Sequence, residues 1–274
     1  MAGVMGSLIR HPAVAGRFYP GNAKALSAAV QSYFPSQFMT TPAIGCIAPH
    51  AGYMYSGPVA GAVFSAIEIP EVCVVLCPNH TGMGTPLSIM SRGQWQTPLG
   101  DLMIDTELAD ALKETYPSLS EDTEAHRSEH AIEVELPFLQ SRNPKVRFVP
   151  IVIGTGNLDV LQPFGYALAK VLRNRPERAL IVASSDMNHY ENDAITRVKD
   201  RKAIDRILAL DPQGLYEVVT RQDVSMCGFG PAIVMLTAAK ELGAHSAELI
   251  RYATSADVSG DRDMVVGYAG VAVR

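Results

Sequence analysis

The fold class of this chain can be predicted from one segment, Val72-Cys73-Val74-Val75-Leu76-Cys77-Pro78-Asn79-His80. Its first part, Val72–Cys77, is a continuous apolar run rich in valine, which is typical of a strand buried on both faces of a parallel sheet. Ligand sites in such sheets form just beyond the carboxyl ends of the strands. We therefore expect His80 to lie at a ligand-binding edge of the sheet.

The rest of the chain alternates short apolar runs with longer helical patterns. Strands are expected at Ile44–Pro49, Pro86–Ser91, Val146–Ile153, Ala179–Ala183, Ala247–Ala253 and Met264–Val273. Helices are expected at Pro58–Ile67, Thr106–Glu114, Leu158–Leu172, Ala194–Leu208, Pro212–Thr220 and Pro231–Leu242. This alternation predicts an α/β fold with a mostly parallel central sheet flanked by helices on both faces.

Length and composition narrow the class of protein. With 274 residues, of which 47% are hydrophobic and 19% charged, the chain fits a globular fold, and we expect one domain over residues 1–274. The net charge of −5 argues against a broad nucleic-acid-binding surface, which would need a basic face. The apolar runs are too short to span a membrane, and the N-terminus does not resemble a signal peptide. We therefore expect a cytoplasmic protein whose four cysteines are reduced thiols.

Three of the expected strands are followed directly by side chains that can bind a metal ion. His50 follows one strand, His80 follows another, and Asp186 and His189 follow a third. A single loop histidine is more often a surface residue, but three such groups at one sheet edge favour a shared polar site. Imidazoles and carboxylates that converge there are typical ligands of a divalent transition metal.

Two further residues are candidates for chemistry at this site. Cys227 lies just before a helix that Pro231 is expected to open, and a thiol beside a helix N-terminus is biased towards the thiolate. His130 begins a helix for which Ser128 is the expected N-cap, and Glu133 on the same face could orient its ring for general acid/base catalysis. The alternatives are a buried structural cysteine and a solvent-facing histidine.

Ordered blocks along nearly the whole chain resemble the Memo family, called AmmeMemoRadiSam system protein B in prokaryotes. The matching blocks are Arg17-Phe18-Tyr19-Pro20, Ala48-Pro49-His50-Ala51-Gly52-Tyr53, Pro78-Asn79-His80, Glu129-His130, Glu135-Leu136-Pro137-Phe138-Leu139, Ser184-Ser185-Asp186-Met187-Asn188-His189-Tyr190, Cys227-Gly228 and Val265-Val266-Gly267-Tyr268-Ala269. The Memo fold is similar to that of the class III extradiol (LigB-like) non-haem iron dioxygenases, so the resemblance implies that fold here.

The resemblance also implies roles for individual residues. They are the metal ligands His50, His80 and Cys227, the catalytic residues His130, Asp186 and His189, and the aromatic pocket walls Phe18 and Tyr55. The implied cofactor is a redox-active or divalent metal, iron first, with copper or zinc as alternatives. The prokaryotic family name further implies a functional link to a radical-SAM protein.

Three functions remain open at this point. The first is a metal-dependent oxidoreductase, although a thiolate replaces the carboxylate of the dioxygenase ligand set, so ring cleavage does not transfer directly. The second is a metal-free hydrolase with Cys227 as nucleophile, which would show rapid alkylation of that thiol near neutral pH. The third is a non-catalytic module that binds a small molecule or a (phospho)peptide, for which Arg17 beside Phe18 could supply a cation.

Overall fold

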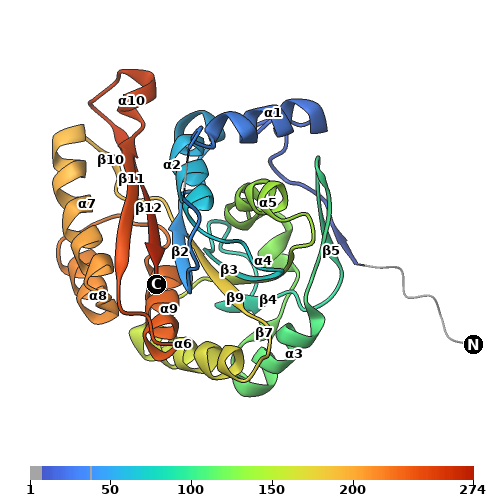
Figure 1. Ribbon diagram of the computed structural model, residues 1–274. Coiled ribbons are helices and arrows are strands. Elements are labelled where there is room, and N and C mark those ends of the chain that lie inside the picture. Colours follow the sequence, from blue (N-terminus) through green and yellow to red (C-terminus); the bar gives the residue numbers. More distant parts are fainter. Residues whose placement is uncertain (1–7, 38) are drawn as a thin grey trace, which may run out of the picture.

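A nine-stranded sheet forms the centre of the protein, in a computed structural model that describes residues 8–37 and 39–274 (Figure 1). Its four central strands are parallel and lie in the order β2 (Gly45–Ala48), β9 (Ala179–Ser184), β3 (Val72–Pro78) and β8 (Arg147–Ile153). All of the apolar runs that predicted these strands are therefore strands, within two residues at either end. Their carboxyl ends meet at one edge of the sheet, as the sequence predicts.

On each side of this centre, the next strand pairs antiparallel with it. On one side β12 (Val265–Val273) pairs with β2 and carries β10 (His189–Glu191) and β11 (Ala247–Thr254); on the other β4 (Leu87–Ile89) pairs with β8 and carries β7 (Ser120–Glu121). A separate small sheet contains β1 (Ile9–Arg10), β5 (Gln94–Thr97) and β6 (Gly100–Met103). The α/β class is confirmed, but within the nine-stranded sheet parallel pairing is confined to the four central strands and the short β4–β7 pair.

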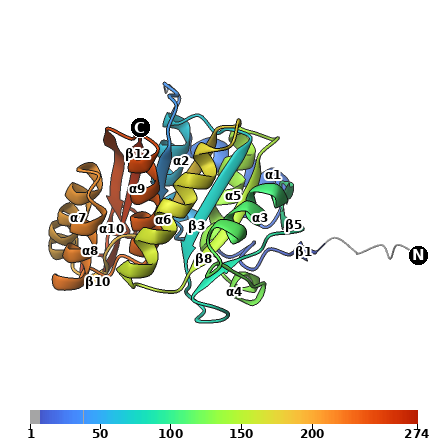
Figure 2. The same ribbon diagram turned by 90° about the horizontal axis from the view of Figure 1, so that it is seen from below.

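Helices cover both faces of the sheet (Figure 2). One face carries α1 (Ala23–Tyr33), α2 (Tyr53–Ala66) and α5 (Ala131–Arg142). The other carries α3 (Thr106–Thr115), α6 (Leu158–Arg173), α7 (Asp193–Leu208), α8 (Pro212–Arg221) and α9 (Phe229–Glu241). Two short helices, α4 (Glu124–Arg127) and α10 (Ala256–Ser259), lie in connections. Among residues 8–37 and 39–274, no helix combines the length and the apolar character needed to cross a membrane.

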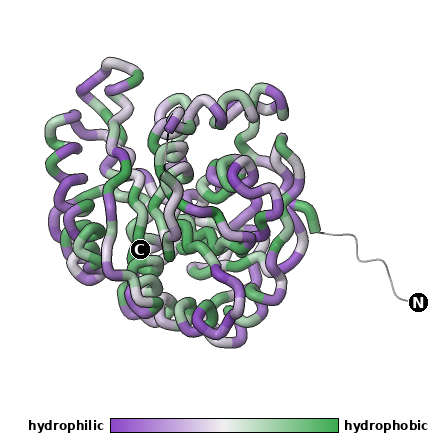
Figure 3. The backbone as a smooth tube through the Cα atoms, viewed as in Figure 1, coloured by the Kyte–Doolittle hydropathy of each residue, from purple (hydrophilic) through white to green (hydrophobic). Residues whose placement is uncertain are grey.

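The positions of the side chains in strand β3 explain why the run Val72–Cys77 is apolar throughout. Successive side chains of a strand point to opposite faces. Val74 and Leu76 accordingly lie in the core under α6 and α9, whereas Cys73, Val75 and Cys77 lie in the core under α2 and α5. All of them are fully buried, and the hydrophobic stretches gather at the strands in the centre of Figure 3. Cys73 and Cys77 are thus core thiols.

Three helix starts differ from the prediction. Helix α2 begins at Tyr53, so Pro58 lies inside it, and α9 begins at Phe229 rather than Pro231. Proline is favoured in a first turn, and this preference misplaced both starts. Helix α5 begins at Ala131 with His130 as N-cap, while Ser128 instead ends the short helix α4.

The close approach of α1 to α2 generates a prediction about stability. A methyl group on Gly61 of α2 would overlap the backbone carbonyl of Tyr33, which cannot move aside as a side chain could. We expect Gly61→Ala to lower the free energy of unfolding by about 1–3 kcal/mol in urea denaturation, despite the better helix propensity of alanine. Met54→Ala in the same helix, at a side chain 62% exposed, is the control and should change stability by less than about 0.5 kcal/mol. An unchanged midpoint for Gly61→Ala would contradict this packing.

Candidate metal centre

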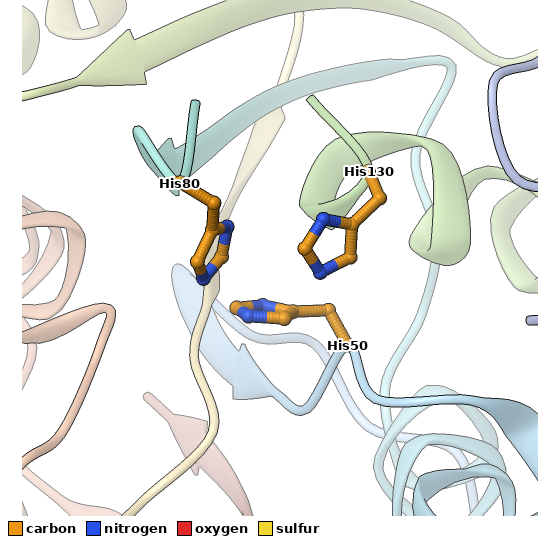
Figure 4. A group of neighbouring side chains, drawn as sticks. All are labelled: His50, His80 and His130. Carbon is orange, nitrogen blue, oxygen red and sulfur yellow. The ribbon is translucent and has the colours of Figure 1, made fainter. Parts of the chain in front are cut away.

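Three histidines from separate elements meet at the carboxyl edge of the parallel strands. His50 follows β2, His80 follows β3, and His130 is the N-cap of α5 (Figure 4). Their ring centroids lie 5.0 Å (His50–His80), 5.4 Å (His50–His130) and 4.6 Å (His80–His130) apart. One nitrogen of each ring lies within 4.8 Å of a nitrogen of the other two. His50 is buried, whereas the His80 side chain is 32% exposed, so the group has one side open to solvent.

Glu129 organises two of these histidines. Its carboxylate is fully buried and accepts hydrogen bonds from the backbone N–H of His80 (2.6 Å), His130 (2.8 Å) and Ala131 (2.9 Å). The same carboxylate contacts Nδ1 of the His80 ring at 2.9 Å and Nδ1 of the His130 ring at 3.3 Å. A carboxylate on Nδ1 fixes the ring orientation and leaves Nε2 as the free ligand atom.

The same contacts shift the pKa values of Glu129 and His80. Burial alone would raise the pKa of Glu129, but hydrogen bonds from His80 and from backbone N–H groups lower it below its usual value. Burial likewise opposes the charge of His80, yet the hydrogen bond and the negative charge of Glu129 raise the pKa of that imidazole. The sequence assigns Glu129 no role of its own, and its position directly before His130 is the signal that could have indicated one.

His50 is held by hydrogen bonds with Ser184 and Asp186 rather than with Glu129. Its Nδ1 lies 2.9 Å from the hydroxyl oxygen of Ser184, and its backbone N–H donates to Oδ1 of Asp186 at 2.9 Å. Burial, reinforced by the neighbouring imidazoles, lowers the pKa of His50 well below its usual value. The ring is therefore neutral, which is the form that binds metals.

Cys227 lies beside His50, with its sulfur 3.3 Å from Nε2 of that ring. The backbone N–H of Asp186 donates to the sulfur at 3.3 Å. Gly228 permits this approach, because a side chain there would collide with Ser184 and Ser185. Burial, together with the charge of Asp186, raises the pKa of the thiol, so the thiolate bias expected at a helix N-terminus is not found without a metal.

Asp186 and His189 border the same region, as predicted. Burial raises the pKa of Asp186 to about 7, although N–H groups of His50 and Ala51 oppose this shift. Nδ1 of His189 lies 2.9 Å from the carbonyl oxygen of Ser225, and burial lowers the pKa of this partly exposed ring. Asp186 therefore contacts the backbone N–H of His50 through its carboxylate and the sulfur of Cys227 through its own backbone N–H, while His189 is anchored to the loop before Cys227.

The two predicted aromatic walls differ in their contacts. The Phe18 ring lies 4.9 Å from the His130 ring, and its backbone carbonyl accepts from the N–H of Tyr53 at 2.8 Å. Phe18 therefore packs directly against the histidine group. Tyr55 is partly buried in the first turn of α2, and within residues 8–37 and 39–274 it makes no ring contact with the three histidines.

Glu133 does not orient His130, contrary to the prediction. It is fully buried and forms an ion pair with Arg10, and it also accepts from Tyr19 Oη at 2.6 Å. Arg10 in turn donates to the backbone carbonyls of His126 (3.1 Å) and Glu129 (2.6 Å). The helix period predicts that Glu133 lies on the same face as His130, but the Glu133 carboxylate is paired with the buried Arg10 instead. The pair ties the N-terminal segment to the loop that carries Glu129.

The donor set fits a transition metal. Neutral imidazole suits zinc, copper and iron, and thiolate suits soft or borderline ions of the same group. A histidine that binds a metal usually donates its other ring N–H to a carboxylate or a carbonyl group, as His80 does to Glu129. These features define an α/β protein with a three-histidine candidate metal centre at the carboxyl edge of its parallel strands.

Comparison with known proteins gives the family. A family model described as Memo-like protein matches residues 10–272, and the chain belongs to this family. A MEMO1 family protein of Methanothermobacter thermautotrophicus is 42% identical over 96% of this chain and 99% of its own, and one of Pyrobaculum aerophilum is 42% identical over 96% and 98%. A crystal structure of an uncharacterized Escherichia coli K12 protein has a TM-score of 0.49 at 14% identity, covering 81% of this chain and 98% of that chain.

The buried Arg10–Glu133 pair predicts a large effect on stability. Glu133→Ala leaves the Arg10 guanidinium buried without its counter-charge, and we expect a loss of about 3–5 kcal/mol in the free energy of unfolding. Asp205→Ala, which breaks the exposed Arg201–Asp205 pair, is the control and should cost less than about 1 kcal/mol. Equal losses for the two variants in urea titrations would show that the buried pair does not hold the N-terminal segment.

The raised pKa of Cys227 predicts slow alkylation of the metal-free protein. Since the thiol is neutral near pH 7, iodoacetamide should modify it more slowly than a free cysteine with a pKa of about 8.5. The rate should rise with pH, and Asp186→Asn should accelerate it by removing a neighbouring negative charge. Peptide mapping by mass spectrometry separates Cys227 from the three core thiols. A rate above that of free cysteine would show that Cys227 is a thiolate near pH 7, and this result would support the hydrolase hypothesis.

Proposed function

We propose that this chain binds one transition-metal ion through His50, His80 and His130. The observation that supports this most strongly is that a nitrogen of each ring lies within 4.8 Å of the others. Ser184 and Glu129 occupy Nδ1 of His50 and His80, so the Nε2 atoms are the proposed ligands. The open side beside His80 would admit a substrate.

Cys227 is the proposed fourth ligand. Its sulfur already lies beside Nε2 of His50, and a coordinating thiol loses its proton to the metal even when burial raises its pKa. The resulting nitrogen and sulfur donor set differs from the two-histidine, one-carboxylate triad of non-haem iron oxygenases. Iron is our first assignment, with copper and zinc as alternatives.

The proposed activity is an oxidoreductase reaction of the oxygenase type. Bound iron or copper would supply the electron transfer for it. Asp186, with a pKa of about 7, can hold or release a proton near neutral pH beside Cys227, and His189 offers a second proton-transfer group at the rim. Phe18 would pack against a substrate that approaches His130.

A binding module remains the second candidate. The exposed side chain of Arg17 adjoins Phe18, so a phosphorylated small molecule or peptide could bind the same pocket without turnover. The metal-free hydrolase has less support, because its nucleophile would be a neutral thiol at pH 7.

Single histidine replacements test the metal site. We expect His50→Ala, His80→Ala and His130→Ala each to weaken binding of iron, copper or zinc by at least about 100-fold. Anaerobic reconstitution with elemental analysis and absorption spectra measures this, and Cys227→Ser should remove any sulfur charge-transfer band. His245→Ala, at an exposed histidine outside the site, is the matched control.

Two outcomes would change the assignment. Fewer than about 0.1 ion per reconstituted wild-type chain would contradict metal binding altogether. Full occupancy in His130→Ala, with loss in the other two variants, would move His130 from the ligand set to proton transfer.

A further inference from the structure

A buried acid lies behind the metal site, on the side of His50 away from Cys227. Glu135 of α5 is fully buried, and its Oε1 lies 2.8 Å from the hydroxyl oxygen of Ser184 in β9. The same hydroxyl oxygen lies 2.9 Å from Nδ1 of His50 and 3.0 Å from the backbone carbonyl of Ala131. Glu135, Ser184 and His50 thus form a continuous hydrogen-bonded chain that ends at a proposed ligand.

The surroundings of Glu135 disfavour a negative charge. It forms no ion pair with any residue in the described ranges 8–37 and 39–274, and its second oxygen, Oε2, is buried without a hydrogen-bond partner. Apart from His50, which Ser184 links to it, the titratable groups whose charges act on Glu135 are Asp186, Tyr53 and Cys46, which are all acids. Burial, followed by the repulsion of Asp186, raises the pKa of Glu135 well above its usual value, and the contact with the Ser184 hydroxyl does not reverse this shift. An isolated buried carboxylate is costly, and such a group takes up a proton instead.

Counting protons gives the direction of each hydrogen bond. The Ala131 carbonyl has no proton and can only accept, so it takes the single hydroxyl proton of Ser184. The two lone pairs of the Ser184 oxygen then accept from the other two neighbours. All three contacts are satisfied only if Glu135 donates from Oε1 and His50 donates from Nδ1.

We propose that Glu135 is a positioning residue, held as the neutral acid, which through Ser184 fixes His50 in its Nδ1–H tautomer. The lone pair of Nε2 then faces Cys227 and the other two histidines. The last step, that this lone pair binds a metal, rests on the proposed function. The protonation of Glu135 and the tautomer of His50 do not depend on it.

Two spectroscopic measurements on metal-free protein test the proposal. Infrared spectra should show the carbonyl band of a protonated carboxylic acid that Glu135→Gln lacks. At about pH 8.5, Asp186 and Asp200, with pKa values of about 7 and about 6, are ionised and do not contribute this band. Glu114→Gln, at an exposed glutamate, is the control and should leave the band intact. Nitrogen-15 spectra of the labelled imidazoles should show His50 with its proton on Nδ1.

The variants separate the acid from its position. Glu135→Gln still offers an N–H donor to Ser184, so His50 should keep its tautomer and metal affinity should stay within about threefold. Ser184→Ala removes the link, and we expect a mixture of tautomers and an affinity loss of about 10–100-fold. Thermal denaturation confirms that each variant folds.

The proposal and the proposed function fail in different ways. An infrared spectrum without the band difference, or a wild-type His50 with its proton on Nε2, would overturn the proposal whatever the metal does. A protein that shows both signatures but binds no metal would contradict the proposed function and leave the hydrogen-bonded chain established.

Discussion

The candidate site depends on the buried carboxylate of Glu129. It accepts hydrogen bonds from three backbone N–H groups, and it also contacts Nδ1 of both His80 and His130. These donors offset the cost of placing a negative charge away from water. The strand exit after β3 and the start of α5 are thereby held together, and this brings His130 to the two histidines that the sheet alone would position. Loss of this carboxylate would release two of the three imidazoles at once.

Three glutamates around the start of α5 are fully buried, and each meets the cost of burial differently. Glu129 is ionised and surrounded by N–H donors, Glu133 is paired with Arg10, and Glu135 is inferred to be protonated. The first orients ligands, the second fixes the segment around Arg10 beside the loop that carries Glu129, and the third is inferred to set the tautomer of the deepest ligand. The start of α5 thus holds three buried carboxyl groups that are stabilised in three different ways, and two of them, Glu129 and Glu135, are linked to the imidazoles by hydrogen bonds.

Much of this arrangement was predictable from the sequence. The apolar run before His80 predicts a strand buried on both faces. Because the carboxyl ends of parallel strands lie at one edge of a sheet, the sequence also places His50, His80 and Asp186 together at that edge. The contacts of Glu129 were not predictable, because the hydrogen bonds of a buried acid depend on which backbone groups the tertiary fold leaves unpaired. Glu133 was assigned to the wrong partner for the same reason: its true partner, Arg10, is 123 residues away in the chain.

X-ray absorption spectroscopy of the metal-loaded protein tests the central claim most directly, since it reports the atoms that surround the ion. Convergence of His50, His80 and His130 beside Cys227 predicts a first shell of imidazole nitrogens at about 2.0–2.1 Å with a sulfur at about 2.3 Å, as for zinc. A first shell of oxygen atoms without the multiple scattering of imidazole rings would contradict the account.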